Sequence, residues 1–292
     1  MTGSRETCVL AVDGGGTRCR IAIHDGAKIV SIEAGSANVS TDFDSSVEQI
    51  RSGLHELAAK MAGQMNDIAQ LPAFVGLAGV TGPEIEGRLR ASLPFDRLRI
   101  EDDRPAAVRG ALEDRDGVIA HCGTGSFYGA QRGGKVRLSG GWGPVLGDEA
   151  SAQWIGRHAL AKVLEVADGR IKKSALAERL LDKFGTAAGV VRFAGTATPA
   201  EFGALAPLVT AHAKENDPLA QHLMKTGASA IARSLTLIGW TPGLPICLTG
   251  GIGPAYQTYL SSEMQADVTA PLGTPLQGAL SLAWDLSRED QG

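Results

Sequence analysis

Two glycine-rich turns, each directly after a short apolar segment, organise this 292-residue sequence. The first reads Asp-Gly-Gly-Gly-Thr at residues 13–17, and the second reads Gly-Thr-Gly-Ser at residues 123–126. Glycine permits tight backbone turns between strands because it adopts positive φ at no steric cost. Further strand-like segments with glycine-rich connections follow each turn. The repetition predicts two strand-rich blocks and therefore a duplicated architecture.

Longer segments with helical spacing lie between and after these blocks. A helix is predicted from about residue 42 to 61, and the next segments read as strand, helix and strand at 73–80, 83–92 and 98–101. We place the boundary between two lobes near residues 113–116, which gives an N-terminal lobe of 1–115 and a C-terminal lobe of 116–292 with helical additions. The final helix, around 275–286, is able to pack back on the first lobe. Further helices are expected at 149–167, 173–184, 199–213 and 218–238, and a buried strand at 245–248.

The composition favours a folded, globular protein and excludes several classes of partner. Apolar residues make up 43% of the chain and charged residues 21%, with a formal net charge of −4. Acidic and basic residues are mixed along the chain, so we expect no nucleic acid partner. The first apolar run of the chain is too short for a signal peptide or a membrane span. The four cysteines are scattered, and we interpret them as reduced core residues. We therefore expect a cytoplasmic protein without a membrane partner.

The first glycine turn has the features of a phosphate-binding loop. Gly14, Gly15 and Gly16 let the backbone approach a bulky anion with exposed N–H groups, and Thr17 adds a hydroxyl donor. Asp13, at the end of a strand, supplies a carboxylate of the kind that Mg²⁺ prefers. A plain glycine-rich β-turn remains an equal alternative from this segment alone. It is not a P-loop, which needs Gly-Lys-Ser/Thr opening a helix.

Two later glycine turns extend this interpretation. A triphosphate held between two glycine hairpins would have its charge met by N–H dipoles and by metal. The third element, residues 248–253, follows a strand and precedes a helical segment, where small residues allow an adenine ring to lie against the backbone. Its alternative is a tight strand-to-helix turn. The residues in question are Gly123, Thr124, Gly125 and Ser126 in the second turn and Gly250, Gly251 and Gly253 in the third.

Taken in order, these elements resemble the signatures of the ATPase superfamily that contains actin, heat-shock chaperones and sugar kinases. The segment from Gly140 to Gly156 more narrowly resembles the BadF/BadG/BcrA/BcrD ATPase family, which includes N-acetylglucosamine kinases and bacterial glucosamine kinases. The resemblance covers nearly the whole chain. It implies an α/β fold of two duplicated ribonuclease H-like, actin-like ATPase lobes with an interlobe cleft, and it implies ATP and Mg²⁺ as cofactors.

The resemblance also implies roles for individual residues. Residues 13–17 become the first phosphate motif, with Asp13 at the metal, 123–126 the second, and 250–253 the adenosine motif. Asp103, after the strand at 98–101, becomes the catalytic carboxylate that accepts the proton of the acceptor hydroxyl. Residues 101–103 offer three carboxylates, of which one needs to face the site. From sequence alone, such a run is more often a solvated loop.

For the sugar, the family pattern implies Asn38, Trp142, Gly143 and Asp148. Polar groups would bind hydroxyls while the indole packs on the ring. Asp148 has a second reading as a helix N-cap, because it precedes a helical run. Phe127-Tyr128 departs from the smaller or amide-bearing residue expected in N-acetylglucosamine kinases.

The expected activity is phosphorylation of an amino sugar, glucosamine or N-acetylglucosamine, at O6 by ATP. One alternative is an activator-type ATPase coupled to electron transfer, which needs cysteine ligands for an iron–sulfur cluster. The other is a nucleotide-regulated sugar sensor. We also expect a homodimer formed through the helical part of the second lobe.

Overall fold

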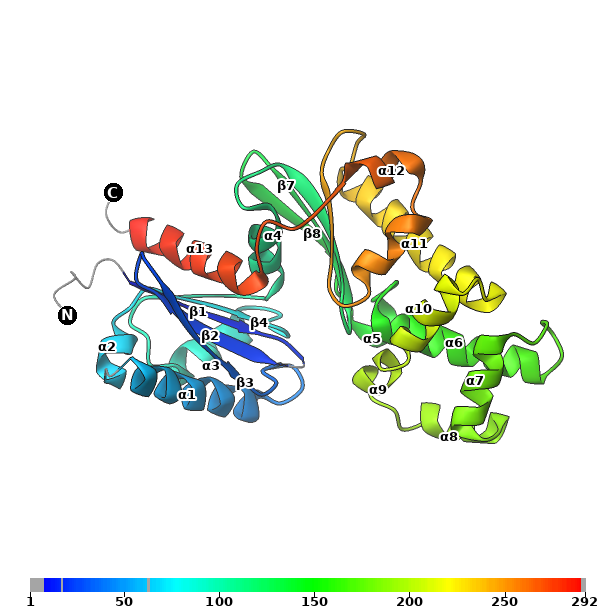
Figure 1. Ribbon diagram of the computed structural model, residues 1–292. Coiled ribbons are helices and arrows are strands. Elements are labelled where there is room, and N and C mark those ends of the chain that lie inside the picture. The colour runs from blue at the N-terminus through cyan, green and yellow to red at the C-terminus, as the bar shows by residue number, and fades with distance from the viewer. Residues whose placement is uncertain (1–7, 17, 62–63, 290–292) are drawn as a thin grey trace. The chain divides into compact units, whose positions relative to one another are not determined.

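The computed structural model describes residues 8–16, 18–61 and 64–289. The chain divides into two compact units, one formed by residues 1–114 with 272–292 and the other by residues 115–271. The lobes expected from sequence, 1–115 and 116–292, differ from this division at the end of the chain. The reason is that the last helix packs on the first unit. Figure 1 shows the elements and their labels.

The first unit contains a five-stranded sheet in the order β3-β2-β1-β4-β5. The first three strands form an antiparallel meander, as the sequence predicts. Strand β4 pairs with β1 in parallel, and β5 pairs with β4 in parallel. The carboxyl ends of β1, β4 and β5 therefore meet at one edge. The bounds are β1 Val9–Gly14, β2 Cys19–His24, β3 Ile29–Ala34, β4 Ala73–Leu77 and β5 Leu98–Glu101.

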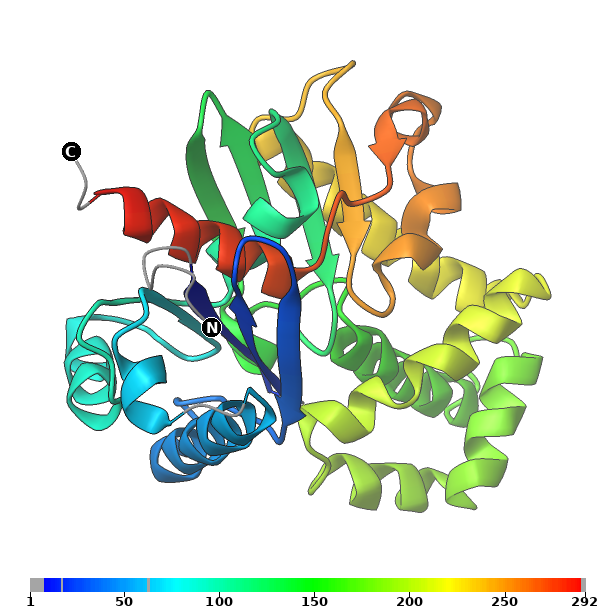
Figure 2. The ribbon, with the colours of Figure 1, turned by 60° about the vertical axis from the view of Figure 1, so that its left-hand side comes forward.

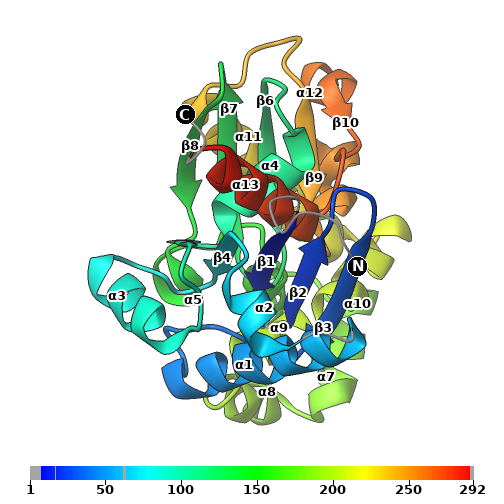
Figure 3. The ribbon, with the colours of Figure 1, turned by 90° about the vertical axis from the view of Figure 1, so that its left-hand side faces the viewer.

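Helices cover both faces of this sheet, which explains why its central strands are buried along their whole length (Figure 3). Helix α1 buries Ile50, Leu54 and Leu57 against one face. Helix α13 and the start of α4 bury small side chains such as Ala279 and Ala106 against the other face. The bounds are α1 Phe43–Lys60, α2 Met65–Ala69, α3 Pro83–Ser92, α4 Arg104–Leu112 and α13 Pro275–Glu289.

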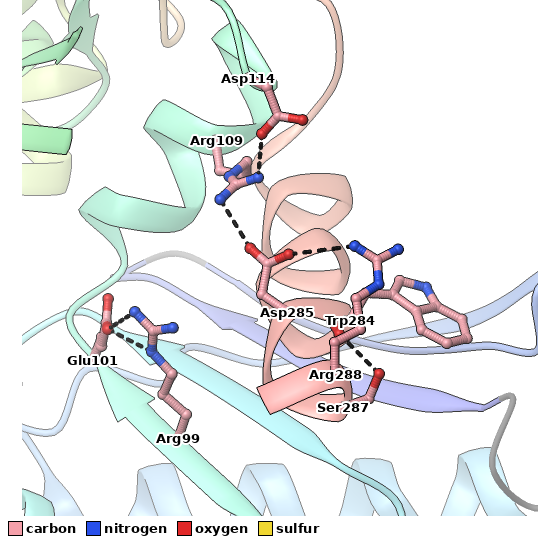
Figure 4. Close-up of polar contacts among 8 residues, drawn as sticks. All are labelled: Arg99, Glu101, Arg109, Asp114, Trp284, Asp285, Ser287 and Arg288. Carbon is pink, nitrogen blue, oxygen red and sulfur yellow. Dashed lines mark hydrogen bonds and ion pairs between the residues drawn. The ribbon is translucent and has the colours of Figure 1, made fainter. Parts of the chain in front are cut away.

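Helices α4 and α13 pack so closely that two glycines are required between them. A Cβ atom on Gly278 would collide with the Ala106 carbonyl oxygen and the Gly110 backbone, and one on Gly110 would collide with the Thr274 backbone. An ion-pair network adds to this contact: Arg109 lies 2.9 Å from Asp285 and 2.6 Å from Asp114 (Figure 4). The position of α4 is thus fixed by the last helix of the chain.

The second unit repeats the topology of the first with different sequence. Its sheet has the order β10-β9-β6-β7-β8, in which β6, β7 and β8 form an antiparallel meander and β9 and β10 pair in parallel. The predicted duplication is therefore confirmed, and the fold is α/β with two lobes. The two-residue strand β10 was not predicted from sequence. The bounds are β6 Gly117–Cys122, β7 Ser126–Arg132, β8 Lys135–Gly140, β9 Ile246–Thr249 and β10 Val268–Thr269.

The helices of the second unit bury one continuous core with one face of its sheet (Figure 2). Helix α11 contributes Leu223, Ile231 and Leu235, and α6 contributes Ile155 and Leu160. No helix in the described part of the chain has the length and apolar character needed to cross a bilayer. The bounds are α5 Gly143–Leu146, α6 Ala152–Ala167, α7 Ala175–Phe184, α8 Ala187–Ala194, α9 Pro199–Gly203, α10 Ala206–Lys214, α11 Pro218–Ile238, the 3₁₀ helix η2 Gly253–Tyr259 and α12 Ser262–Asp267.

The close contact between α4 and α13 leads to a first prediction. Gly278→Ala should lower the free energy of unfolding by about 1–3 kcal/mol, because the new methyl group forces the two helices apart. Gly87→Ala, on the exposed side of α3 with nothing near its Cβ position, should instead raise it by roughly 0.5–1 kcal/mol through helix propensity. Urea unfolding followed by circular dichroism measures both, and equal effects at the two sites would contradict the packing argument.

Candidate active site

Strand pairing brings the acidic residues at the ends of β1 and β5 to one edge of the first unit's sheet. Asp13 on β1 is in register with Gly76 on β4, and Gly76 is in register with Glu101 on β5. Gly76 has no side chain, and a Cβ atom there would lie 3.5 Å from the Asp103 Cα. The start of α4 can therefore approach the sheet, and Asp103 lies close enough to Asp13 for their charges to interact.

The three carboxylates of residues 101–103 have three different environments. Glu101 is held by Arg99, whose Nε and Nη2 lie 2.7 Å and 2.6 Å from Glu101 Oε1 (Figure 4). Asp102 is held by Arg104, whose Nε and Nη2 donate to its two oxygens at 2.7 Å and 3.0 Å. Asp103 begins α4 without capping it through its side chain. Among the described residues, no side chain forms a hydrogen bond or ion pair with the Asp103 carboxylate.

The environment of Asp103 disfavours its ionised form. The pKa of Asp103 is raised from its ordinary value of 3.8 to about 7. Burial is the largest cause, followed by the charges of Asp102 and Asp13. Its own backbone N–H and the guanidinium of Arg104 oppose the rise. A carboxyl group with a pKa near neutrality exchanges protons readily at physiological pH. This is the property required of a general base.

Asp13 is the more deeply buried of the two, with 8% of its surface exposed. Burial raises its pKa, while Arg20 and then Arg18 lower it. Arg20 Nη2 lies 3.0 Å from Asp13 Oδ2, yet this buried oxygen accepts no directed hydrogen bond from any described residue. A buried carboxylate oxygen with unused acceptor capacity fits Mg²⁺, which takes one or two protein carboxylates and completes its shell with water and phosphate.

The backbone after Asp13 is tightly constrained by its neighbours. A side chain at Gly14 would collide with Leu77, so this position has no room for one. The Gly15 N–H donates to the Arg18 carbonyl at 2.9 Å, which closes the turn. Gly16 has open space around its Cβ position, with only the Asn38 amide nitrogen 3.9 Å away. Thr17, the predicted hydroxyl donor, lies outside the described residues.

Asn38 lies beside this turn, half-buried, and bridges to Ala78 after β4. Its Oδ1 accepts hydrogen bonds from the Ser40 N–H at 3.1 Å and the Ser40 hydroxyl at 2.8 Å. The side-chain oxygen is thus occupied within its own loop, whereas the amide nitrogen points toward Gly16. Asn38 therefore brings donor N–H groups to the glycine turn.

In the second unit, residues 123–126 form the predicted hairpin turn between β6 and β7. The Gly123 N–H donates to the Gly125 carbonyl at 2.9 Å, and the Gly123 carbonyl accepts from the Ala152 N–H at the start of α6. A Cβ atom at Gly125 would lie 2.8 Å from Asp148 Oδ2. Thr124, at the tip, is exposed. The turn is therefore anchored by α6 and by the segment before it.

Asp148 does not cap α6, contrary to the second reading of the sequence. The N-cap is Ser151, whose Oγ accepts a hydrogen bond from the Trp154 N–H at 3.2 Å. Asp148 has φ of 61°, so the backbone turns at this residue, three positions before the N-cap. Its residue surface is 6% exposed. Burial raises the pKa of Asp148, and the backbone N–H groups of Ser126 and Gly143 oppose the rise. Its carboxylate thus connects two glycine segments.

The turn at residues 250–253 lies directly against the hairpin turn. Gly250 has φ of 79°, and a Cβ atom there would collide with the Cys122 carbonyl and lie 2.7 Å from the Gly123 nitrogen. The Ile252 N–H donates to the same Cys122 carbonyl at 3.1 Å. Gly251 has nothing near its Cβ position, and Gly253 is buried at the start of η2. The predicted second phosphate turn and adenosine turn are therefore adjacent within this unit.

Trp142 and Gly143 lie in an exposed segment that leads into α5. The Trp142 side chain is 75% exposed, and Gly143 has φ of 86°, which favours glycine at this position. By contrast, Phe127 and Tyr128 are 7% and 3% exposed. These two aromatic residues, which depart from the family pattern, therefore belong mainly to the interior of the second unit.

Sequence reasoning missed two polar contacts next to these turns. Arg20 was not singled out, although its position directly opposite Asp13 follows once β1 and β2 are read as a hairpin. Thr249 was read only as part of the third turn, but its Oγ1 lies 3.1 Å from His121 Nδ1. Burial lowers the pKa of His121 to about 4, so the ring is neutral at pH 7. The parallel pairing of β6 and β9 places His121 beside Thr249.

Comparison with known proteins adds to this geometry. The model of the BadF/BadG/BcrA/BcrD ATPase family matches residues 10–283. The chain belongs to this family. The match spans both units, and it confirms the resemblance first seen in the glycine segments. Members of a family share a fold more reliably than a substrate, so the activity is argued from the site.

Among curated relatives, glucosamine kinase GspK of Vibrio cholerae is 27% identical over 278 residues, covering 94% of this chain and 95% of its own length. The N-acetylmuramic acid/N-acetylglucosamine kinase of Clostridium acetobutylicum is 31% identical over 183 residues, covering 60% and 59%. A solved structure from Chromobacterium violaceum, assigned as an N-acetylglucosamine kinase, has a TM-score of 0.85 and 32% identity, covering 95% of this chain and 99% of that one.

The raised pKa of Asp103 predicts a pH-dependent cost to folding. The folded state binds the proton more tightly than the unfolded state. As the pH rises from about 4 to 7, this group therefore lowers the free energy of unfolding progressively. Asp103→Asn should therefore raise the free energy of unfolding by about 2–4 kcal/mol at pH 8 and by less at pH 5. Urea titrations at the two pH values measure the difference.

Asp102→Asn is the matched control, because its carboxylate is paired with Arg104. Loss of that partly buried pair should cost about 1 kcal/mol at pH 8, offset in part because the charge of Asp102 no longer raises the pKa of Asp103. A gain in Asp103→Asn that is the same at pH 5 and pH 8 would contradict the assigned pKa.

Proposed function

We propose that this chain is an ATP-dependent kinase that transfers the γ-phosphoryl group of ATP to an amino sugar, glucosamine or N-acetylglucosamine, at O6. The observation that carries the proposal is the state of Asp103. Two neighbouring carboxylates are each held by an arginine, whereas Asp103 has no such partner and has its pKa raised to about 7. The amino-sugar kinases among its relatives support the choice of acceptor.

The proposed reaction assigns the proton transfer to Asp103. The acceptor hydroxyl attacks the γ-phosphorus, the new O6–P bond forms, and the bond from phosphorus to the bridging oxygen of ADP breaks. The hydroxyl proton goes to the Asp103 carboxylate, which must be ionised beforehand. The fixed start of α4 orients this group, because α4 packs closely against α13 and its start contacts β4.

We assign nucleotide binding to the glycine turns of both units. The turns at residues 14–17 and 123–126 would meet the phosphate charge with those backbone N–H groups that are not bonded within the turns, since Gly15 and Gly123 already donate to Arg18 and Gly125. Residues 250–253 would contact adenosine. Gly251 supports this assignment because its Cβ position faces open space. Asp13 would hold Mg²⁺ directly or through water, and the ion would neutralise charge on the phosphates.

For the sugar, we assign Asn38, Trp142, Gly143 and Asp148. The amide nitrogen of Asn38 is a donor suited to a hydroxyl, and the exposed Trp142 indole offers an apolar face for the C–H surface of a pyranose ring. Asp148 would act mainly by holding the backbone N–H groups of Ser126 and Gly143, with the remaining acceptor capacity available for a sugar hydroxyl. A cytoplasmic location and a homodimer remain expectations from the sequence.

The activator-type ATPase is not favoured. An iron–sulfur cluster requires cysteine thiolates. The cysteines outside the first strands, Cys122 and Cys247, are both buried, and burial raises the pKa of Cys122 to about 12 and also raises that of Cys247. The nucleotide-regulated sensor is less consistent with a carboxylate whose pKa suits proton transfer.

Substitution of Asp103 tests the assigned base. Asp103→Asn should lower kcat by at least about hundredfold, the usual contribution of general base catalysis. Its ATP affinity, measured by calorimetry, should stay close to that of the unchanged protein because the amide keeps the shape of the carboxyl group. Near-normal turnover would remove Asp103 from this role.

The pH profile gives a second test, with Asp102→Asn as its partner. In the unchanged protein, kcat/KM should fall below about pH 7 as Asp103 becomes protonated. The charge of Asp102 raises the pKa of Asp103, so Asp102→Asn should move this fall to lower pH. An unmoved profile would assign the titration to another group.

A substrate screen tests the acceptor. ADP release should be measured with glucose, glucosamine, N-acetylglucosamine and N-acetylmuramic acid, each with ATP and Mg²⁺. We expect an amino sugar to give the highest kcat/KM, and product analysis should find the phosphate on O6. Equal or greater activity with glucose would refute the proposed specificity.

A further inference from the structure

The three arginines paired with Asp13, Glu101 and Asp102 differ in how completely they contact their carboxylates. Arg104 and Arg99 each approach their carboxylate with both Nε and Nη2, at 2.6–3.0 Å. Such two-point contacts are the stronger form of the pair. Arg20 makes a single contact to Asp13, between Nη2 and Oδ2 at 3.0 Å.

Two polar atoms of the Asp13–Arg20 pair, one on each residue, are buried without a directed hydrogen bond to any described residue. Among the described residues, neither Arg20 Nε nor Asp13 Oδ2 takes part in a directed hydrogen bond. Buried polar atoms without hydrogen bonds are uncommon in folded proteins because each one costs free energy. The pair therefore neutralises charge without completing the hydrogen bonds of either partner.

Arg20 is placed at Asp13 by the hairpin itself. The two residues are cross-strand partners in the antiparallel pairing of β1 and β2. The Asp13 side chain is 10% exposed and that of Arg20 is 30% exposed, so Asp13 would be a nearly buried, uncompensated charge without the arginine. Such a charge is strongly destabilising. Arg20 is thus the resident cation of this carboxylate.

We propose that Arg20 is a positioning residue that occupies the Asp13 carboxylate in the metal-free protein and gives it up when Mg²⁺ arrives with the nucleotide. This inference rests on the proposed function, in which Asp13 holds the metal. A guanidinium and a divalent cation compete for the same buried oxygen. Displaced Arg20 then needs an anionic partner, and the nucleotide phosphates at the adjacent glycine turn supply one.

The competition has a defined consequence for metal binding. Mg²⁺ alone must displace Arg20 without offering it a new partner, so the metal should bind weakly in the absence of nucleotide. Mg²⁺ and nucleotide together meet both requirements. Arg20 therefore couples occupancy of the metal site to occupancy of the phosphate site, and a coupling of this kind is reciprocal.

The test compares Arg20→Gln with Arg18→Gln. Arg18 lies on the same hairpin but is 58% exposed and 3.8 Å from Glu33, so its removal changes the net charge equally without emptying the Asp13 contact. Mg²⁺ alone is titrated first, with thermal unfolding as the measurement. Calorimetry then gives the ADP affinity with and without Mg²⁺, which requires no turnover.

In Arg20→Gln, Mg²⁺ alone should raise the melting temperature more than it does in the unchanged protein. Its half-saturating concentration should fall by roughly fivefold or more, the lower end of couplings between linked sites. Arg18→Gln should change this response much less, because Arg18 acts on Asp13 through charge but does not contact its carboxylate. Arg20→Lys, which keeps the charge, should retain weak binding of Mg²⁺ alone and covers the case in which the glutamine variant folds poorly.

Adding Asp13→Asn to Arg20→Gln should remove the enhanced response to Mg²⁺, because the carboxylate is its source. An unchanged or weaker response to Mg²⁺ in Arg20→Gln would overturn the inference while leaving the kinase proposal standing. Failure of the unchanged protein to bind ADP or ATP in either condition would instead refute the proposed function.

Discussion

Parallel pairing of β1, β4 and β5 is the constraint on which the candidate active site depends. It places the ends of three strands at one edge, and Gly76 in the middle strand leaves room for the start of α4. Asp13 and Asp103 therefore lie within electrostatic reach of each other although 90 positions separate them in the sequence. Burial, followed by the charges of Asp102 and Asp13, raises the pKa of Asp103.

Burial raises the pKa of both Asp13 and Asp103, but the charged groups nearest to them act in opposite directions. Asp13 is opposite Arg20, which favours its charged form, whereas Asp103 is beside two carboxylates, which favour its neutral form. Environments that separate the pKa values of neighbouring acids commonly divide their roles in catalysis. The same arrangement suits one carboxylate for a metal and the other for a proton. It also accounts for the expected cost of Asp103 to stability.

The second unit uses the same strand order for a different purpose. Its glycine turns pack against each other, since Gly250 lies on the backbone at Cys122 and Gly123. Asp148, which lies before α6, connects the hairpin turn to the Gly143 segment rather than capping the helix. Local sequence did not distinguish these roles, because both require an acid shortly before a helical run. The structure shows that Ser151 caps the helix, because its Oγ accepts a hydrogen bond from the Trp154 N–H.

The sequence by itself determined the two meanders, the main helices, the family and the identity of the candidate residues. These follow from local patterns: alternation in strands, helical spacing, and glycine where a turn needs it. The tertiary structure was needed to show which of three adjacent carboxylates is left without an arginine, how Arg20 contacts Asp13, and that the last helix packs on the first unit, as the sequence allows. Those outcomes depend on the directions that side chains take at the ends of strands and on the packing of helices, and neither leaves a periodic signal in the sequence.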